Sequence, residues 1–124
     1  MKNIIITFLL LLTFTSYSQE PKCSNFKCGK FKYSNPKYSE WIVMRTDSTQ
    51  TEKSSISGIE IKSSIEWKSD CEYVLVYKRI LNAEAKNMIG KIVRVKIVQT
   101  ESDRYTCISK DEKNELELEM IKIE

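Results

Sequence analysis

Hydrophobic and polar residues alternate along most of this chain with the period of two that is typical of β-strands. The apolar residues share one parity in segments 59–67, 93–97 and 116–120, whereas Glu, Lys, Arg and Ser occupy most of the intervening positions. Segment 71–78 has the same alternation, with valines on its second face. This pattern predicts strands that bury one face in a core and leave the other in solvent.

Turn signals separate these segments, for example Ser-Asn-Pro at 34–36 and Thr-Asp-Ser-Thr at 46–49. Eight strand-like segments lie between 28 and 123, and the single helix candidate is Asn82–Met88, with Asn82 as its N-cap and Gly90 after its end. Regularly spaced short strands predict an all-β fold, an antiparallel up-and-down meander that closes into a barrel of about eight strands. A β-sandwich is the alternative.

The N-terminus has the three parts of a secretory signal: a basic start at Lys2, an apolar run at 4–14, and the small residues Ser16 and Ser18. The run is too short to span a bilayer, which takes ~20 apolar residues. We expect a signal peptide over 1–18 and a single β domain over 19–124. Export to the periplasm or the extracellular space follows. Cys23 is too far from the cleavage point for a lipoprotein.

Four cysteines, Cys23, Cys28, Cys71 and Cys107, lie in the predicted mature chain. In a small exported domain four cysteines indicate two disulfides, for which three pairings exist. The preferred pairing is Cys71–Cys107 with Cys23–Cys28. A zinc site is the alternative, but it usually needs two C-x2–4-C knuckles, and only Cys23 and Cys28 approach one.

The composition argues against several functions. The chain has no histidine, which removes the commonest general base and metal ligand. It has 20 Lys+Arg against 17 Asp+Glu and a net charge of +3, so no polyanion-binding surface is indicated. Motifs for a serine nucleophile, a phosphate loop or an EF-hand are absent from the sequence. We therefore expect no enzymatic activity, no cofactor, no metal and no nucleic-acid partner.

A polar group around the turn at 46–49 is the main candidate site. Arg45 shares the parity of Trp41, so if that face is buried Arg45 needs a partner, which Gln50 or Glu52 can supply. One interpretation is a polar anchor at a barrel mouth that binds a ligand beside Trp41 and Trp67. The other is a surface hairpin with ordinary charge pairs, which the sequence favours because exposed pairs contribute under ~1 kcal/mol.

Aromatic residues of the predicted strands either line a ligand cavity or fill the core, and core filling is favoured in so short a chain. They are Phe31, Tyr33, Trp41, Trp67, Tyr73, Tyr77 and Tyr105.

Two resemblances extend this interpretation. Gly29-Lys30-Phe31 resembles the Gly-x-aromatic start of lipocalin-like barrels. The stretch CSNFKCGKFKY, the segment from Trp41 to Glu52, and IEWKSDCEYVLVY resemble small uncharacterised exported proteins of Bacteroidetes. Some of those carry a DNA topoisomerase IV label, which this chain's short length and export signal do not support. The resemblance implies a family without an assigned activity.

The sequence thus predicts an exported, non-catalytic module that binds a small apolar or amphipathic ligand. The alternative is an interaction module, such as an inhibitor of an envelope or host hydrolase. After signal cleavage we expect no membrane span.

Overall fold

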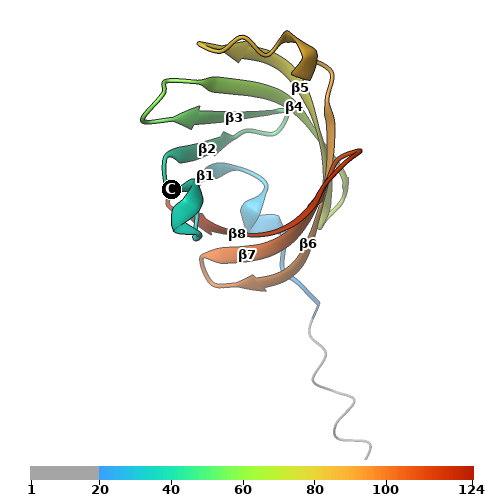
Figure 1. Cartoon of the computed structure of the whole chain (residues 1–124). Helices are drawn as coiled ribbons and strands as arrows, with labels where there is room; N and C mark the ends of the chain where they lie inside the picture. The colour runs from blue at the N-terminus through green and yellow to red at the C-terminus, as the bar shows by residue number, and fades with distance from the viewer. Residues whose placement is uncertain (1–19) are drawn as a thin grey trace, which may run out of the picture.

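A closed antiparallel barrel forms the body of the protein in the computed structural model, which describes residues 20–124 (Figure 1). The predicted signal peptide lies outside the described residues. Each strand pairs with its neighbours in the sequence, and β1 pairs with β8 to close the ring. The strands are β1 (Gly29–Tyr33), β2 (Trp41–Arg45), β3 (Thr49–Ser54), β4 (Glu60–Ser69), β5 (Glu72–Leu81), β6 (Ile92–Glu101), β7 (Arg104–Lys110) and β8 (Glu115–Lys122).

The alternation of the sequence sets which side chains face the inside of the barrel. In β6, Val93, Val95 and Ile97 are 8%, 5% and 2% exposed, while the residues between them are exposed. The same alternation buries the inward residues of β2 and β7. The predicted fold class, an up-and-down meander closed into a barrel, is confirmed, and the sandwich alternative is wrong.

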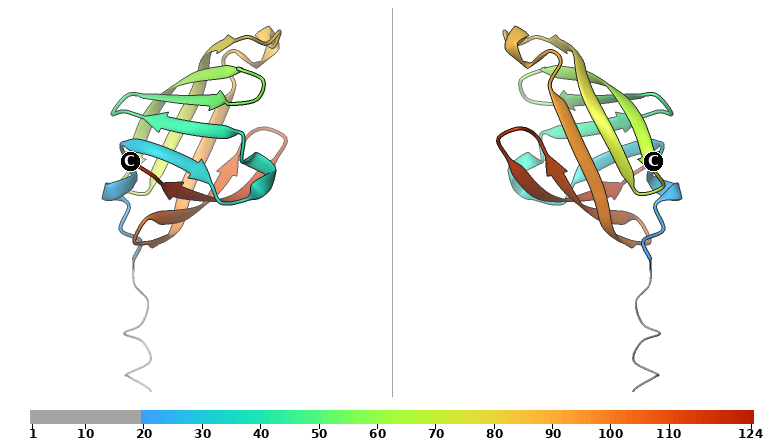
Figure 2. Two further views of the ribbon diagram at one scale, coloured as in Figure 1. Left: turned by 90° about the vertical axis from the view of Figure 1, so that its left-hand side faces the viewer. Right: turned by 90° about the vertical axis from the view of Figure 1, so that its right-hand side faces the viewer.

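The N-terminal segment covers one end of the barrel, near the C-terminus (Figure 2). A 3-10 turn, Ser24–Phe26, places Phe26 inside the barrel, where it is 2% exposed and its ring meets Tyr105 edge-on at 5.2 Å. A disulfide from Cys23 to Cys71 fixes this segment, which we call the plug (residues 20–28), to the β4–β5 turn. For a sequence separation of 48 between the two cysteines, the chain-entropy model gives a stabilisation of about 4 kcal/mol.

The predicted disulfide pairing is therefore wrong. Cys71 is bonded to Cys23, and Cys107, which faces the barrel interior in the middle of β7, is a free, buried thiol. Cys28 is free and exposed, with its thiol 3.1 Å from Asp47. The disulfide also uses two of the four thiolates that a four-cysteine zinc site needs.

The predicted helix at Asn82–Met88 is not formed. Asn82 has a φ of 63°, the left-handed conformation, and its side chain donates a hydrogen bond of 2.8 Å to the carbonyl of Gly58, just past the paired ends of β4 and β5. Only Lys86–Met88 makes a single 3-10 turn. Within residues 20–124, no helix is long and apolar enough to cross a membrane.

The structure gives a reason for the glycine in the Gly-x-aromatic start of β1. It has a φ of 130°, and a Cβ at this position would come within 2.6 Å of the backbone oxygen of Glu124. The glycine therefore lets the chain end pass close to β1, whose Lys30 donates to that same oxygen at 3.0 Å. Phe31, two residues on, is 0% exposed in the core.

Candidate functional site

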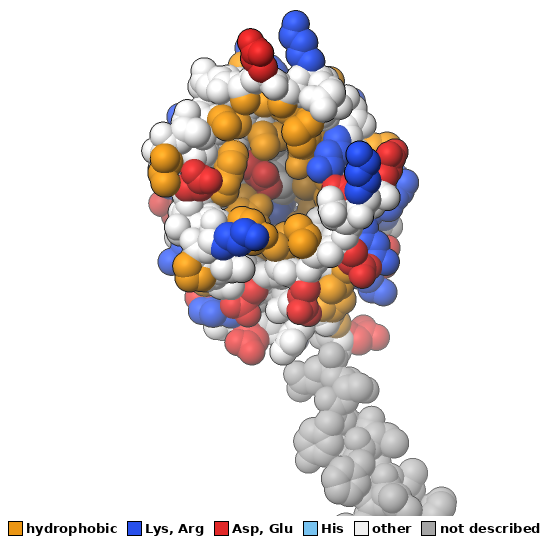
Figure 3. Space-filling model, in the orientation of Figure 1, with side chains coloured by type: hydrophobic (Ala, Val, Ile, Leu, Met, Phe, Trp, Pro, Cys, Tyr) orange, Lys and Arg blue, Asp and Glu red, His pale blue; other side chains and the backbone are white. Residues whose placement is uncertain are grey.

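A cavity of about 220 Å³ opens at the end of the barrel opposite the plug. Figure 3 looks into this mouth, where hydrophobic side chains surround the opening and an acidic side chain lies inside it. An engineered cavity of about 150 Å³ holds a benzene molecule, so this one has room for a ring with a short substituent. Part of its wall is apolar and comes from three strands, β5, β6 and β8: Leu75, Val93, Val95, Leu118 and Met120.

Arg45 forms the floor of the cavity and is 4% exposed. Its Nε donates to Gln50 Oε1 at 3.0 Å, and one terminal nitrogen donates to the backbone oxygen of Phe26 at 2.8 Å. The other terminal nitrogen donates to the hydroxyls of Tyr73 and Tyr105, at 3.1 and 2.9 Å. A guanidinium has five N–H donors, so this network leaves one of them free.

Aromatic rings complete the environment of Arg45. Its guanidinium carbon lies 4.5 Å from the centre of the Phe31 ring and 4.8 Å from that of Tyr73. Burial by itself lowers the pKa of Arg45, but the electrostatic influence of Tyr73 and Tyr105 raises it, and the pKa ends above its usual value. Arg45 therefore stays charged inside the barrel, where it ties the plug to β2 and β3.

The interpretation of this turn as a surface hairpin is wrong for its inward residues. Arg45 and Gln50 are 4% and 3% exposed, because both lie on the parity that points into the barrel. The expected pairing of Arg45 with β3 is present as the bond to Gln50. Glu52 makes no ion pair with Arg45 but lies one inward position further along β3.

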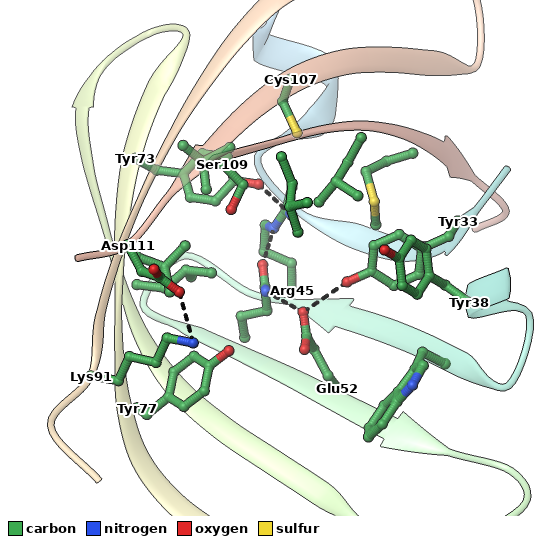
Figure 4. A pocket seen from close by; sticks show the side chains of 18 residues that line it. Tyr33, Tyr38, Arg45, Glu52, Tyr73, Tyr77, Lys91, Cys107, Ser109 and Asp111 are labelled. Carbon is green, nitrogen blue, oxygen red and sulfur yellow. Dashed lines mark hydrogen bonds and ion pairs between the residues drawn. The ribbon is translucent and has the colours of Figure 1, made fainter. Parts of the chain in front are cut away.

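Glu52 provides a carboxylate on the cavity wall (Figure 4). The hydroxyl of Tyr33 donates to Glu52 Oε1 at 3.1 Å, and the side-chain amide of Gln50 donates to the same oxygen at 3.2 Å. Burial raises the pKa of Glu52, and the hydrogen bonds from Tyr33 and Gln50 and the charge of Arg45 only partly oppose this. The carboxylate is thus partly buried on the cavity wall and has no ion-pair partner among residues 20–124.

An ion pair stands at the mouth of the cavity. Lys91 Nζ lies 2.9 Å from Asp111 Oδ2 and 5.5 Å from the centre of the Tyr77 ring. The bond to Lys91, together with the backbone amides of Lys113 and Asn114, lowers the pKa of Asp111 to about 2. Burial, with the nearby Glu52 and Asp111 charges, raises the pKa of Tyr77 to about 12.

The two tryptophans proposed as ligand contacts lie in different parts of the barrel, and only Trp41 lines the cavity. Trp41 lines the cavity with Arg45, Gln50 and Glu52, as expected under the less favoured interpretation, a polar anchor at a barrel mouth. Trp67 does not line it, because it lies near the β4–β5 turn at the plugged end, 4.7 Å from Tyr73 between ring centres. Its indole nitrogen is buried without a hydrogen-bond partner in the described part of the chain.

The other aromatic residues divide between the two roles that the sequence leaves open. Phe31 and Tyr105, at 0% and 1% exposed, fill the core around Arg45. Tyr33 and Tyr77 line the cavity, and Tyr73 takes part in both.

Sequence reasoning missed Tyr38, Lys91 and Asp111 among the cavity residues. Tyr38 lies in the β1–β2 connection, where no strand periodicity applies. Lys91 and Asp111, in contrast, continue the inward parity of β6 and β7, so extending the alternation past the strand ends is the signal that finds them.

Comparisons with protein-family models, with curated proteins and with solved structures find no match for this chain. The geometry of the cavity therefore supplies the functional argument.

Proposed function

We propose that the protein is an exported, non-catalytic binding module whose barrel cavity holds a small amphipathic ligand. The observation that supports this most is the combination of an open apolar chamber with a few inward polar groups. Leu75, Val95 and Leu118 line its walls, and Glu52 and Tyr33 present polar atoms in the same space. Ligand sites in proteins have this composition, with few polar groups that orient a mostly apolar ligand.

The size of the cavity limits the ligand. Sites for drug-sized molecules measure about 300–1,000 Å³. At about 220 Å³, this cavity fits a smaller molecule, such as a single ring or a short branched chain with one polar group. The plug closes the opposite end, so the ligand enters past Lys91 and Asp111.

The disulfide between Cys23 and Cys71 supports the exported part of the proposal, because such bonds persist in oxidising compartments. The non-catalytic part is supported by the roles of the inward polar residues. Arg45 is committed to structural bonds, and the acidic group Asp111 is held in an ion pair.

Fragment binding tests this function. We expect small single-ring molecules to shift the NMR resonances of cavity residues such as Val95, and a Leu118→Trp substitution, which fills the chamber, to abolish the shifts. Glu117→Trp is the matched control, since Glu117 is exposed on the outer face of the same strand. Circular dichroism checks that both variants fold. Absence of binding, or equal binding by the Leu118→Trp variant, would refute the proposal.

A further inference from the structure

One oxygen of the Glu52 carboxylate has no partner inside the cavity. Both hydrogen bonds that the carboxylate accepts, from Tyr33 and Gln50, end on Oε1. Among residues 20–124, no ion pair involves Glu52 and no hydrogen bond reaches its Oε2. Glu52 is partly buried, and a carboxylate that a ligand shields further from water needs a cation or further donors to compensate its charge.

The cations of the cavity do not fill this position. Arg45 donates four of its N–H groups, to Gln50, Phe26, Tyr73 and Tyr105, and is 4% exposed. These bonds hold its guanidinium at the floor of the cavity. Its rigid arrangement also leaves no pair of donors for a bidentate bond to a ligand carboxylate. Arg45 is therefore not available as a ligand anchor, and Glu52 is the charged group left for that role.

Lys91 is the second cation that lines the cavity, and it is paired with Asp111 at 2.9 Å. The charge of Lys91 favours the ionised form of Glu52, but less than the charge of Arg45 does. Four charged side chains thus line the cavity. Lys91 and Asp111 pair with each other, Arg45 is held by its hydrogen bonds at the floor, and Glu52 keeps one oxygen without a partner.

Aromatic residues share the cavity with this carboxylate. Tyr33, Tyr38, Trp41 and Tyr77 all contribute to its lining, and Figure 4 shows Tyr33 and Tyr38 on one side of Glu52 and Tyr77 on another. The faces of aromatic rings attract cations, and such interactions strengthen where water is displaced. The same residues offer a flat apolar surface to the rest of a ligand.

We propose that the ligand is a small primary amine, whose ammonium group pairs with Glu52 Oε2 and whose single-ring or branched apolar body occupies the chamber. This inference rests on the proposed function, because it names the ligand class for the same cavity. The ammonium supplies the charge that Glu52 lacks, and the chamber beyond it, bounded by Leu75, Val93 and Leu118, takes the apolar body.

A dependence of amine affinity on pH follows from the assignment. Burial raises the pKa of Glu52, against the opposing influence of the hydrogen bonds from Tyr33 and Gln50 and the charges of Arg45 and Lys91. An ammonium beside Oε2 favours the ionised carboxylate, so amine binding lowers this pKa and releases a proton from Glu52 where the group is protonated. Amine affinity then rises with pH through the titration of Glu52, as long as the amine itself remains protonated.

Three probes of one shape test the inference: phenethylamine, 2-phenylethanol and 3-phenylpropionate. Dissociation constants are measured by NMR titration of the full mature protein at neutral pH and low salt. We expect the amine to bind at least tenfold more tightly than either analogue. The Glu52→Gln variant should bind the amine about tenfold more weakly while binding the alcohol as before. The Glu117→Gln variant, changed on the outer face of β8, should bind the amine as the original chain does.

The outcomes separate the two proposals. Equal or tighter binding of the alcohol or the carboxylate overturns the amine assignment and leaves the binding function standing. Amine binding that survives Glu52→Gln unchanged also overturns it, because the ammonium is then held elsewhere. If none of the three probes binds, both proposals fail.

Discussion

Replacing Arg45 with methionine removes the group that joins the plug to the barrel while keeping a side chain of similar length. The Phe26 carbonyl and the Gln50 side-chain oxygen then lose their donors inside the core. The hydroxyls of Tyr73 and Tyr105 are better placed, since they lie 3.1 Å apart and can bond to each other.

The expected loss of stability follows from these contacts. A buried acceptor left without a donor costs about 1–3 kcal/mol. Two such acceptors, offset in part because methionine needs no desolvation, give an expected decrease of about 3 kcal/mol in the free energy of unfolding. Arg45→Lys keeps the charge but has three donors without the planar fork, and we expect about half of that loss.

Urea denaturation with the disulfide intact, followed by tryptophan fluorescence, measures these changes. The matched control is Arg94→Met on the exposed face of β6, which should change stability by no more than about 0.5 kcal/mol. Amide hydrogen exchange adds a local measurement, because loosening of the plug should speed exchange at Phe26 N–H, which bonds to the Cys23 carbonyl. If Arg45→Met costs no more than Arg94→Met, Arg45 does not hold the plug as argued.

Three further predictions use the free thiols and the titrating carboxyls. Without reductant, an alkylating reagent should modify the native protein once, at exposed Cys28, and should modify buried Cys107 only after unfolding. Intact mass spectrometry counts the added groups, and no labelling of the native protein would contradict the disulfide assignment. Because the pKa of Glu52 in the folded state is raised above 4.5, the folded state binds more protons there, and this group's contribution to stability falls as pH rises above 4.5. In urea titrations Glu52→Gln should therefore gain stability relative to the original chain as pH rises; a difference in unfolding free energy that does not change with pH argues against this. Lys91 and backbone amides lower the pKa of Asp111 from 3.8 to about 2, so its stabilising contribution is present above pH 3.8 and is lost as pH falls through 2. Asp111→Asn should reduce the loss of unfolding free energy over this acidic range, and an unchanged loss would show that the pair does not stabilise the fold.

Much of the fold follows from the alternation in the sequence, because successive side chains of a strand point to opposite faces of the sheet. The parity of Val93 and Val95 marks them as inward whatever the neighbouring strands are, and the structure buries both. The same rule identifies Arg45 as inward if its strand is half-buried. The interpretation as a surface hairpin failed because an isolated charge near a turn is usually solvated, and nothing local shows that four acceptors surround this one.

The disulfide and the helix illustrate the other limit. Cys23 and Cys71 meet because the plug crosses the barrel end and reaches the β4–β5 turn, a contact over 48 residues that spacing does not encode. Asn82 has the residue type of an N-cap, but in the folded chain it takes a left-handed conformation and bonds to Gly58 in another loop. Each local preference is worth about 1 kcal/mol, so such long-range contacts override it.

By itself the sequence determined the strand-rich class, the meander order and the inward set of side chains, because these depend on neighbours along the chain. Only the tertiary structure decided that Arg45 forms the floor of the cavity rather than a ligand contact, and that one oxygen of Glu52 has no partner. Those features depend on distances between strands that are remote in sequence. The cavity exists because the plug and Arg45 close one end of the barrel while the other end stays open.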